Sequence, residues 1–382
     1  MKAGRIATAL EGASTRRFGF SRFSGLWLMV GLVMLVLAAS VVSLGTGAVG
    51  LSPERVLRVL WLEVTGAHDM ASAGDRLVVI GIRLPRTLLG LLVGGALAVS
   101  GALMQGLFRN PLADPGLAGV SSGAALAAAL VIVAGQPVGA FLAAVAPAST
   151  IGASAWIGGG APFALLPIAA FGGGLLVTLL LYSLSTRNGE TRVATLLLAG
   201  VAVGALTGAI TGLLSYLSND RQLRDLTFWS LGSLGGTTWD RLATVTPAIL
   251  PVFIAVPFLA RGLNALALGE AEAFHLGIAV QRVKRAALFL VAVAVGAAVA
   301  TSGVIGFVGL VVPHLLRLLH GADHRTLLPA SALLGGALLL GADCLARTIV
   351  APAELPIGIL TAALGAPFFL WLLLTRSRDL SI

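Results

Sequence analysis

One short stretch, residues 263–277, carries polar groups between two long apolar runs. It reads LNALALGEAEAFHLG, and Glu270, Glu272 and His275 could contact charged groups of a partner. Alanine and leucine favour helix, whereas Gly269 and Gly277 tend to end one. The stretch therefore predicts two short helices with a bend. Such a projecting segment, called the knob below, could bind another protein. An ordinary connection between two helices would explain the same residues equally well.

A pair of arginines could bind an anionic ligand. Arg221 and Arg224 lie three residues apart in SNDRQLRDLTFWSLG, so a helix would place both on one face. Two guanidinium groups suit a ligand with two carboxylates, since each can form paired hydrogen bonds. The alternative is that Asp220 and Asp225 neutralise the two arginines locally.

Two further residue pairs could form a proton relay or a metal site, but the evidence for each is weaker. Asp343 and Arg347 lie four residues apart inside an apolar run, where a charged pair could form a proton relay of a secondary transporter. His320 and His324 are also four apart, but they lie in a Gly-Ala-Asp turn without an HExxH pattern. The sequence therefore predicts no metal site.

The composition is that of an integral membrane protein. The chain has 382 residues, of which 57% are apolar and only 11% charged, whereas soluble domains carry about 25% charged residues. The net charge of +9 does not indicate nucleic-acid binding, because the arginines are scattered among apolar segments rather than gathered on a soluble domain. Cys344 is the single cysteine and can form no intrachain disulfide.

Apolar segments long enough to form membrane-spanning helices recur along the chain. We predict ten spans, at residues 26–45, 84–108, 117–135, 162–185, 193–217, 242–259, 283–301, 304–319, 327–345 and 357–375. Residues 1–25 form a basic extension, 26–375 the membrane domain and 376–382 a tail. With both termini in the cytoplasm, most basic residues fall on the cytoplasmic side. The first span is interpreted as an uncleaved anchor, with a signal peptide as the alternative.

Two segments between spans need separate interpretation. Residues 51–65 are too short and too charged to span, and Ser52 and Pro53 are typical of a helix start, so an interfacial helix is expected. Residues 136–161 are apolar but rich in Gly, Pro and Ser. They either lengthen a helix or form a loop.

Three long motifs carry a resemblance to a known family. They are RLPRTLLGLLVGGALAVSGALMQGLFRNPLADPGLAGVSSGA at residues 83–124, GVIGFVGLVVPHLLRLLHGADHRTLLPAS at 303–331, and AELPIGILTAALGAPFFLWLLL at 353–374. Over residues 51–374 the chain resembles the membrane-spanning permease subunits of ABC importers for iron chelates, haem and cobalamin. The basic N-terminal extension and the 136–161 segment depart from the family pattern.

The resemblance implies an all-α protein with ten transmembrane helices per subunit, half of a homodimeric type II ABC importer permease in the bacterial cytoplasmic (inner) membrane. Its implied partners are two copies of an ABC ATPase subunit and a periplasmic or extracytoplasmic substrate-binding protein. The chain contains no GxxxxGK[ST] phosphate loop, so ATP and Mg would be used by the partner ATPase. We expect no enzymatic activity and no cofactor bound by this chain.

The resemblance also assigns roles to residues. The ATPase-coupling set is Leu268, Gly269, Glu270, Glu272, Ala273, Leu276 and Gly277. Arg55, Arg58 and Arg347 are expected to dock the binding protein, with anchoring to lipid headgroups as the alternative. Residues 218–232 look most like the haem-importing branch, so Arg221 and Arg224 are expected to line a haem pathway. A ferric siderophore or cobalamin is the alternative cargo, and a proton-coupled secondary transporter is the alternative class.

Overall fold

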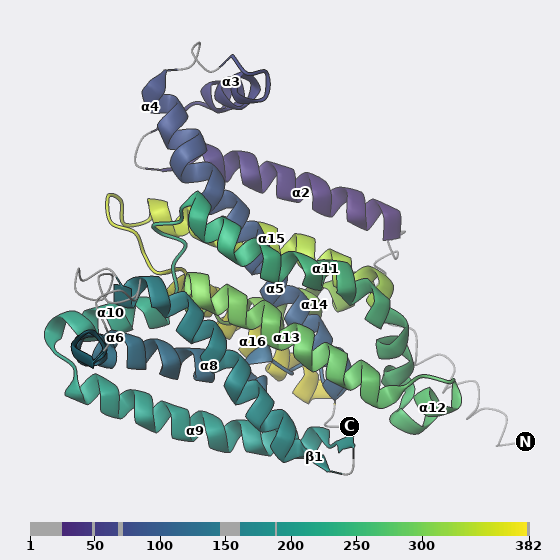
Figure 1. The fold of residues 1–382 in the computed structure, drawn as a ribbon. Helices are drawn as coiled ribbons and strands as arrows, with labels where there is room; N and C mark the ends of the chain where they lie inside the picture. The colour runs from purple at the N-terminus through teal and green to yellow at the C-terminus, as the bar shows by residue number, and fades with distance from the viewer. Residues whose placement is uncertain (1–24, 48–49, 68–71, 146–160, 188, 380–382) are drawn as a thin grey trace, which may run out of the picture.

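The computed structural model describes residues 25–47, 50–67, 72–145, 161–187 and 189–379. Within them the chain is a bundle of helices with a single two-stranded hairpin (Figure 1). In chain order, the helices before the hairpin are α2 (Gly25–Gly45), α3 (Pro53–Val64), α4 (Ala73–Arg76), η2 (Leu77–Arg83), α5 (Leu84–Phe108), η3 (Pro115–Ala118), α6 (Val120–Val145) and α8 (Ala161–Ser185).

The hairpin joins α8 to the second half of the bundle. Its strands are β1 (Thr186–Arg187) and β2 (Glu190–Thr191), paired antiparallel. The helices that follow are α9 (Val193–Leu217), α10 (Asp220–Leu231), α11 (Trp239–Leu268), α12 (Glu270–His275), α13 (Val280–Ser302), α14 (Val308–Leu319), α15 (His324–Thr348) and α16 (Ile357–Asp379).

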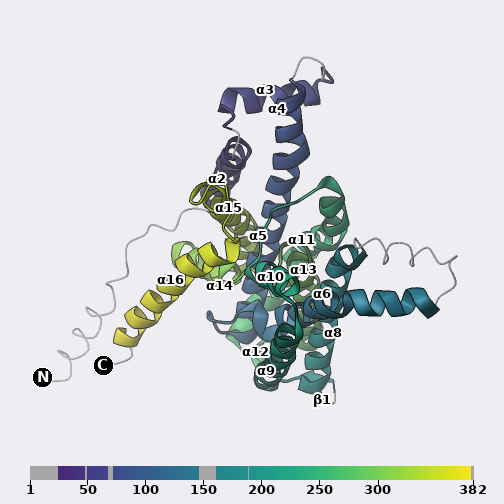
Figure 2. The ribbon, with the colours of Figure 1, turned by 90° about the vertical axis from the view of Figure 1, so that its left-hand side faces the viewer.

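Helix α5 is the centre of the bundle. It continues from α4 and η2 without a break, and α11, α13, α14 and α15 surround it (Figures 1 and 2). Most of its residues are buried. Its apolar sequence has no polar stripe because protein rather than water covers nearly every face.

Glycines allow the central helices to approach closely. Gly94 of α5 faces Gly335 of α15, and Gly101 of α5 faces Gly309 of α14. A Cβ atom at Gly94 or Gly101 would overlap the carbonyl group of the facing glycine. Lipid offers little hydrophobic drive between helices, so close backbone contact through small residues is a main source of their packing.

The predicted spans coincide with helices, but their lengths differ. Among the residues that the structure describes, seven helices are long and apolar enough to cross a membrane. The other three predicted segments fall on shorter apolar helices, Val120–Gly135, Val308–Leu319 and Ile357–Leu370. Helix α14 starts later than predicted, because residues 303–307 before it, which include Gly303 at φ +70°, are not helical.

The structure shows a short helix within residues 51–65 and a lengthened α6 in the first part of residues 136–161. The short helix expected within residues 51–65 is confirmed as α3, with Pro53 in its first turn and the Ser52 hydroxyl accepting a hydrogen bond from the Arg55 amide at 3.4 Å; its place at the membrane interface stays a prediction. Residues 136–145 lengthen α6, and α8 begins at Ala161. Residues 146–160 and the basic extension 1–24 lie outside the described residues.

Candidate functional site

The predicted knob at residues 263–277 has the expected bent shape. Helix α11 ends at Leu268, and Gly269 follows with φ +136°. Helix α12 then runs for six residues and ends before Gly277, whose φ is +79°. Side chains resist such positive φ values, and a Cβ atom at Gly269 would also overlap the Glu272 carboxylate. The two predicted helix ends are confirmed.

An apolar edge of this knob is exposed at the end of the bundle. The exposed fractions of Leu268, Phe274 and Leu276 are 67%, 71% and 63%, whereas Ala273 is fully buried against the bundle. Figure 1 shows α12 projecting from one end, the end at which α2 begins. Exposed apolar patches rimmed by polar residues mark interaction sites, and Glu272 and His275 are exposed beside these three side chains.

The two acidic residues of α12 have different surroundings. Glu272 is exposed, as expected for a group that meets a partner. Glu270 instead accepts a hydrogen bond from Lys284 of α13, at 2.6 Å. The sequence gives no local sign of this ion pair, because Lys284 lies on a different helix, 14 positions along the chain from Glu270.

The opposite end of the bundle carries α3. Arg55 and Arg58 are exposed on it, roughly one helical turn apart, while Val56 and Val59 face a small apolar cluster. An ion pair between Glu63 and Arg76, 2.8 Å long, ties α3 to α4. The two arginines are therefore presented on a helix that is anchored at its far end.

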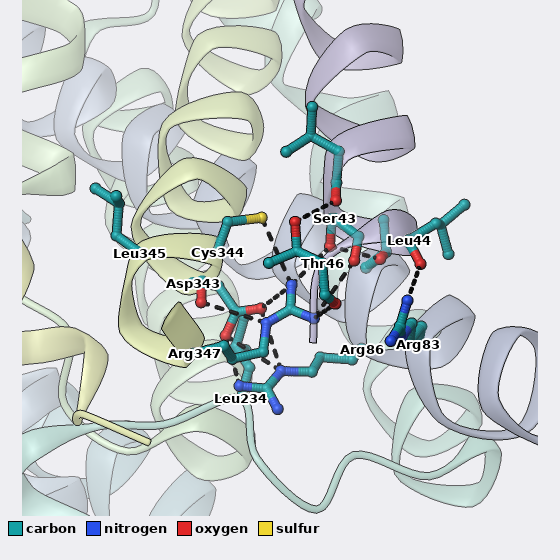
Figure 3. Close-up of polar contacts among 12 residues, drawn as sticks. Ser43, Leu44, Thr46, Arg83, Arg86, Leu234, Asp343, Cys344, Leu345 and Arg347 are labelled. Atoms are coloured by element: carbon teal, nitrogen blue, oxygen red, sulfur yellow. Dashed lines mark hydrogen bonds and ion pairs between the residues drawn. The ribbon is translucent and has the colours of Figure 1, made fainter. Parts of the chain in front are cut away.

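Arg347 does not lie on that surface. Its exposed fraction is 7%, and it pairs with Asp343, one turn earlier on α15, at 2.9 Å. It also donates hydrogen bonds to the end of α2, to the carbonyl of Thr46 at 3.0 Å and the hydroxyl of Ser43 at 3.1 Å. Figure 3 shows this guanidinium directed into the contact between α2 and α15. In this conformation a docked protein could reach Arg55 and Arg58 but not Arg347.

Asp343 lies at the centre of a larger charged network. It is fully buried and also pairs with Arg86 of α5, at 2.8 Å. Arg86 reaches Glu354, in the segment between α15 and α16, at 2.9 Å. Arg86 and Glu354 belong to the long motifs at residues 83–124 and 353–374, but neither motif predicts that the two residues pair. Charged residues in apolar runs usually find partners inside the protein, and that signal could have suggested it.

Arg221 and Arg224 are both exposed on α10. Asn219 and Gln222 form a capping box that fixes the start of this helix, and α10 lies away from α12 (Figure 1). Within the described part of the chain, neither arginine forms an ion pair with Asp220 or Asp225. The predicted pair is therefore open to an approaching anion in this conformation.

Metal binding finds no support among the residues that the structure describes, where no three His, Cys, Asp or Glu side chains gather. Of the two histidines considered above, His324 is buried and its Nδ1 lies 2.8 Å from the Asn264 side-chain oxygen. This contact fixes the junction of α11 and α15.

Comparison with known proteins identifies the family. The sequence matches the profile of the FecCD transport family over residues 34–375. The chain belongs to the FecCD transport family. That membership confirms the resemblance found in the motifs, and together with the apolar helices it establishes a multi-pass inner-membrane protein.

FecCD relatives with curated descriptions are similar over most of their length. The hemin transport system permease protein HmuU of Yersinia pestis is 47% identical over 365 residues, covering 92% of this chain and 96% of that protein. The cobalamin import system permease protein BtuC of Halobacterium salinarum is 45% identical, covering 78% and 74%. The vitamin B12 import system permease protein BtuC of Salmonella typhi is 41% identical, covering 92% and 96%.

A solved structure shows that the FecCD chain also shares its fold with a transporter. That structure is assigned to the metal-chelate type of ABC transporter and captured in an inward-facing conformation. It aligns with a TM-score of 0.74 at 32% identity, covering 91% of this chain and 98% of the other.

Proposed function

We propose that this chain is the permease subunit of an ATP-driven importer. The observation that carries the proposal is a match along nearly the whole chain to import permeases, combined with a fixed α12 knob at one end of the bundle. In this proposal two copies form a homodimer with ten spans each. Two ABC ATPase subunits bind at the α12 end, and an extracytoplasmic binding protein delivers the cargo at the other end.

The residue roles follow the two ends of the bundle. The coupling surface comprises Leu268, Gly269, Glu270, Glu272, Ala273, Leu276 and Gly277. Exposed Arg55 and Arg58 form the docking surface for glutamates of the binding protein, since guanidinium groups bind carboxylates with two parallel hydrogen bonds. Arg347 would join that surface only after leaving its pairing with Asp343.

The alternative class, a proton-coupled secondary transporter, rested on Asp343 and Arg347. A proton relay needs a carboxylate that can reach water and change partners. Asp343 is fully buried, and two guanidinium groups hold it. Uptake into proteoliposomes decides between the classes. We expect uptake only with the ATPase, ATP and the binding protein present, and uptake driven by a proton gradient without the ATPase would refute the proposal.

For the cargo, we propose haem. The hemin permease is 47% identical, slightly above the two cobalamin permeases. Haem carries two carboxylates on a flat apolar ring, and the exposed pair Arg221 and Arg224 supplies matching guanidinium groups. A homodimer would present this pair twice around one entrance.

Ferric siderophore and cobalamin are the other candidate cargoes. The deciding experiment measures binding of haem, a ferric siderophore and cobalamin to the cognate binding protein, followed by uptake of whichever ligand binds. We expect haem to bind most tightly. Exclusive binding of either other ligand would leave the importer assignment intact and remove the haem assignment.

A further inference from the structure

Lys284 is a buried cation that the proposed coupling surface does not explain. Its exposed fraction is 2%, and burial of an ammonium group is unfavourable unless its protons are bonded. The ammonium donates to the Glu270 carboxylate at 2.6 Å and to the backbone carbonyl of Thr191 at 3.0 Å. Glu270 belongs to α12, and Thr191 belongs to strand β2.

Helix α13 therefore holds the hairpin through both backbone groups of Thr191. The Thr191 carbonyl accepts from Lys284, and its amide donates to the Gln281 side chain at 3.1 Å. Gln281 and Lys284 are three residues apart, on one helix face. Inside the hairpin, the hydroxyls of Thr186 and Thr191 lie 3.0 Å apart. The hairpin is thus bound to α13 at the point where α12 is also bound.

This arrangement connects α12 to two long helices. Strand β1 follows α8 directly, and β2 leads into α9, so any displacement of the hairpin acts on the ends of both. Glu270 and Glu190 also line one groove of about 790 Å³, between α12, the hairpin and the start of α13. Within the described residues, Lys284 is the side chain whose ion pair crosses from α13 to α12.

We propose that Lys284 is a positioning residue that makes the hairpin follow α12, so that a displacement of α12 reaches α8 and α9. This inference rests on the proposed function, in which an ATPase moves α12. The Glu270 side chain is 44% exposed, so the α12 partner of this ion pair is in contact with water. The ammonium remains buried against the hairpin.

The first test replaces the charge but keeps the volume. Lys284→Met has a similar unbranched chain and provides neither hydrogen bond. In proteoliposomes containing the permease, its ATPase and its binding protein, we expect assembly and basal ATP hydrolysis to persist. Loss of both hydrogen bonds of the charged ammonium should lower cargo transported per ATP by at least about tenfold. A residue that only fills space would leave that ratio unchanged, so an unchanged ratio overturns the inference.

The second test restores the link with a covalent tether. Glu190 and Ala271 both line the groove, Glu190 on the hairpin and Ala271 on α12, so Glu190→Cys with Ala271→Cys is treated with bifunctional thiol reagents of increasing length until one joins the two residues. In the Lys284→Met background, we expect the tether to recover most of the lost transport per ATP. The same cysteine pair without reagent, and the tether in a chain that keeps Lys284, are the matched controls. A tether that forms without restoring transport overturns the inference.

Two further results separate possible failures. If Lys284→Met does not fold, Glu270→Gln replaces it, since the amide oxygen still accepts from Lys284 but carries no charge. A smaller loss of transport per ATP is then expected, and an unchanged ratio overturns the inference. If the unmodified complex shows no ATP-dependent transport, the proposed function itself fails. If the unmodified complex couples ATP hydrolysis to transport, and Lys284→Met transports as much cargo per ATP as the unmodified complex, only the role of Lys284 is refuted.

Discussion

Arg347 and Arg58 carry the same charge, but their surroundings make them respond differently to mutation. Arg347→Ala would leave Asp343 buried with only Arg86 as a cation and would remove the hydrogen bonds to the end of α2. Breaking a buried ion pair by removing one partner destabilises proteins by about 3–5 kcal/mol. We expect a clearly lower thermal midpoint for the purified permease in detergent.

Arg58→Ala is the matched control for that measurement. Arg58 is exposed, and surface substitutions usually change the free energy of unfolding by at most about 0.5 kcal/mol. If Arg347→Ala kept the wild-type thermal midpoint and slowed binding-protein association, Arg347 would be a docking residue that leaves its buried position on binding.

Charge on α3 should govern the encounter with the binding protein. Reversal of both charges, Arg55→Glu with Arg58→Glu, should slow association and flatten its dependence on ionic strength, because rim charges act mainly on the association rate. Surface plasmon resonance over a series of salt concentrations measures both effects. Arg221→Glu with Arg224→Glu makes the same charge change on α10 and should leave docking almost unchanged. An unaltered salt profile in the α3 variant would favour lipid-headgroup anchoring.

At the scale of single elements, α12 depends on the backbone of Gly269. Gly269→Val places a β-branched side chain at φ +136° and against Glu272, so the junction of α11 and α12 must change shape. We expect ATP hydrolysis without matching transport. Transport and hydrolysis rates measured together in proteoliposomes provide the test. Gly204→Ala in α9 has open space around it and serves as the control; full coupling in both variants would contradict the assignment of α12.

The contact between α5 and α15 depends on Gly94. Gly94→Val would force the two helices apart, since its first side-chain atom already overlaps the Gly335 carbonyl. Overpacking of this kind destabilises by about 1–3 kcal/mol or more. Thermal unfolding and the yield of monodisperse protein should both fall. Gly208→Val changes a glycine of α9 with open space around it, so its thermal midpoint and its yield should fall much less. Equal losses in the two variants would show that helix propensity, rather than the contact between α5 and α15, is responsible.

The cargo pathway belongs to the scale of the whole molecule, because it needs two subunits and a delivering protein. Replacing Arg221 and Arg224 by Ala should reduce haem uptake while binding-protein association and ATP hydrolysis remain. Each guanidinium–carboxylate contact contributes about as much as one hydrogen bond to a charged group, so uptake at limiting haem should fall by about tenfold for each arginine that is replaced. Haem uptake at the wild-type rate would remove the two arginines from the pathway and leave the family assignment standing.

Local interactions made much of this protein predictable from its sequence. The apolar runs, the cap at Ser52 and the helix-ending glycines 269 and 277 each depend on neighbouring residues, so spacing and residue type were sufficient. The membrane class followed from composition, since protein-wide hydropathy does not depend on how the helices are arranged. The long motifs added the family, which the comparisons then confirmed.

Only the tertiary structure decided which charges are available to partners. Arg86 pairs with Asp343, 257 positions away in the sequence. Lys284 binds both Glu270 and Thr191, and Thr191 lies 93 positions before Lys284. No local pattern encodes such pairings, because they depend on which helices lie side by side. Arg347 and Arg58 carry the same charge, yet the packing of α2 against α15 buries Arg347 while α3 exposes Arg58. A buried charge in lipid must find its partner inside the bundle, and the bundle therefore determines its role.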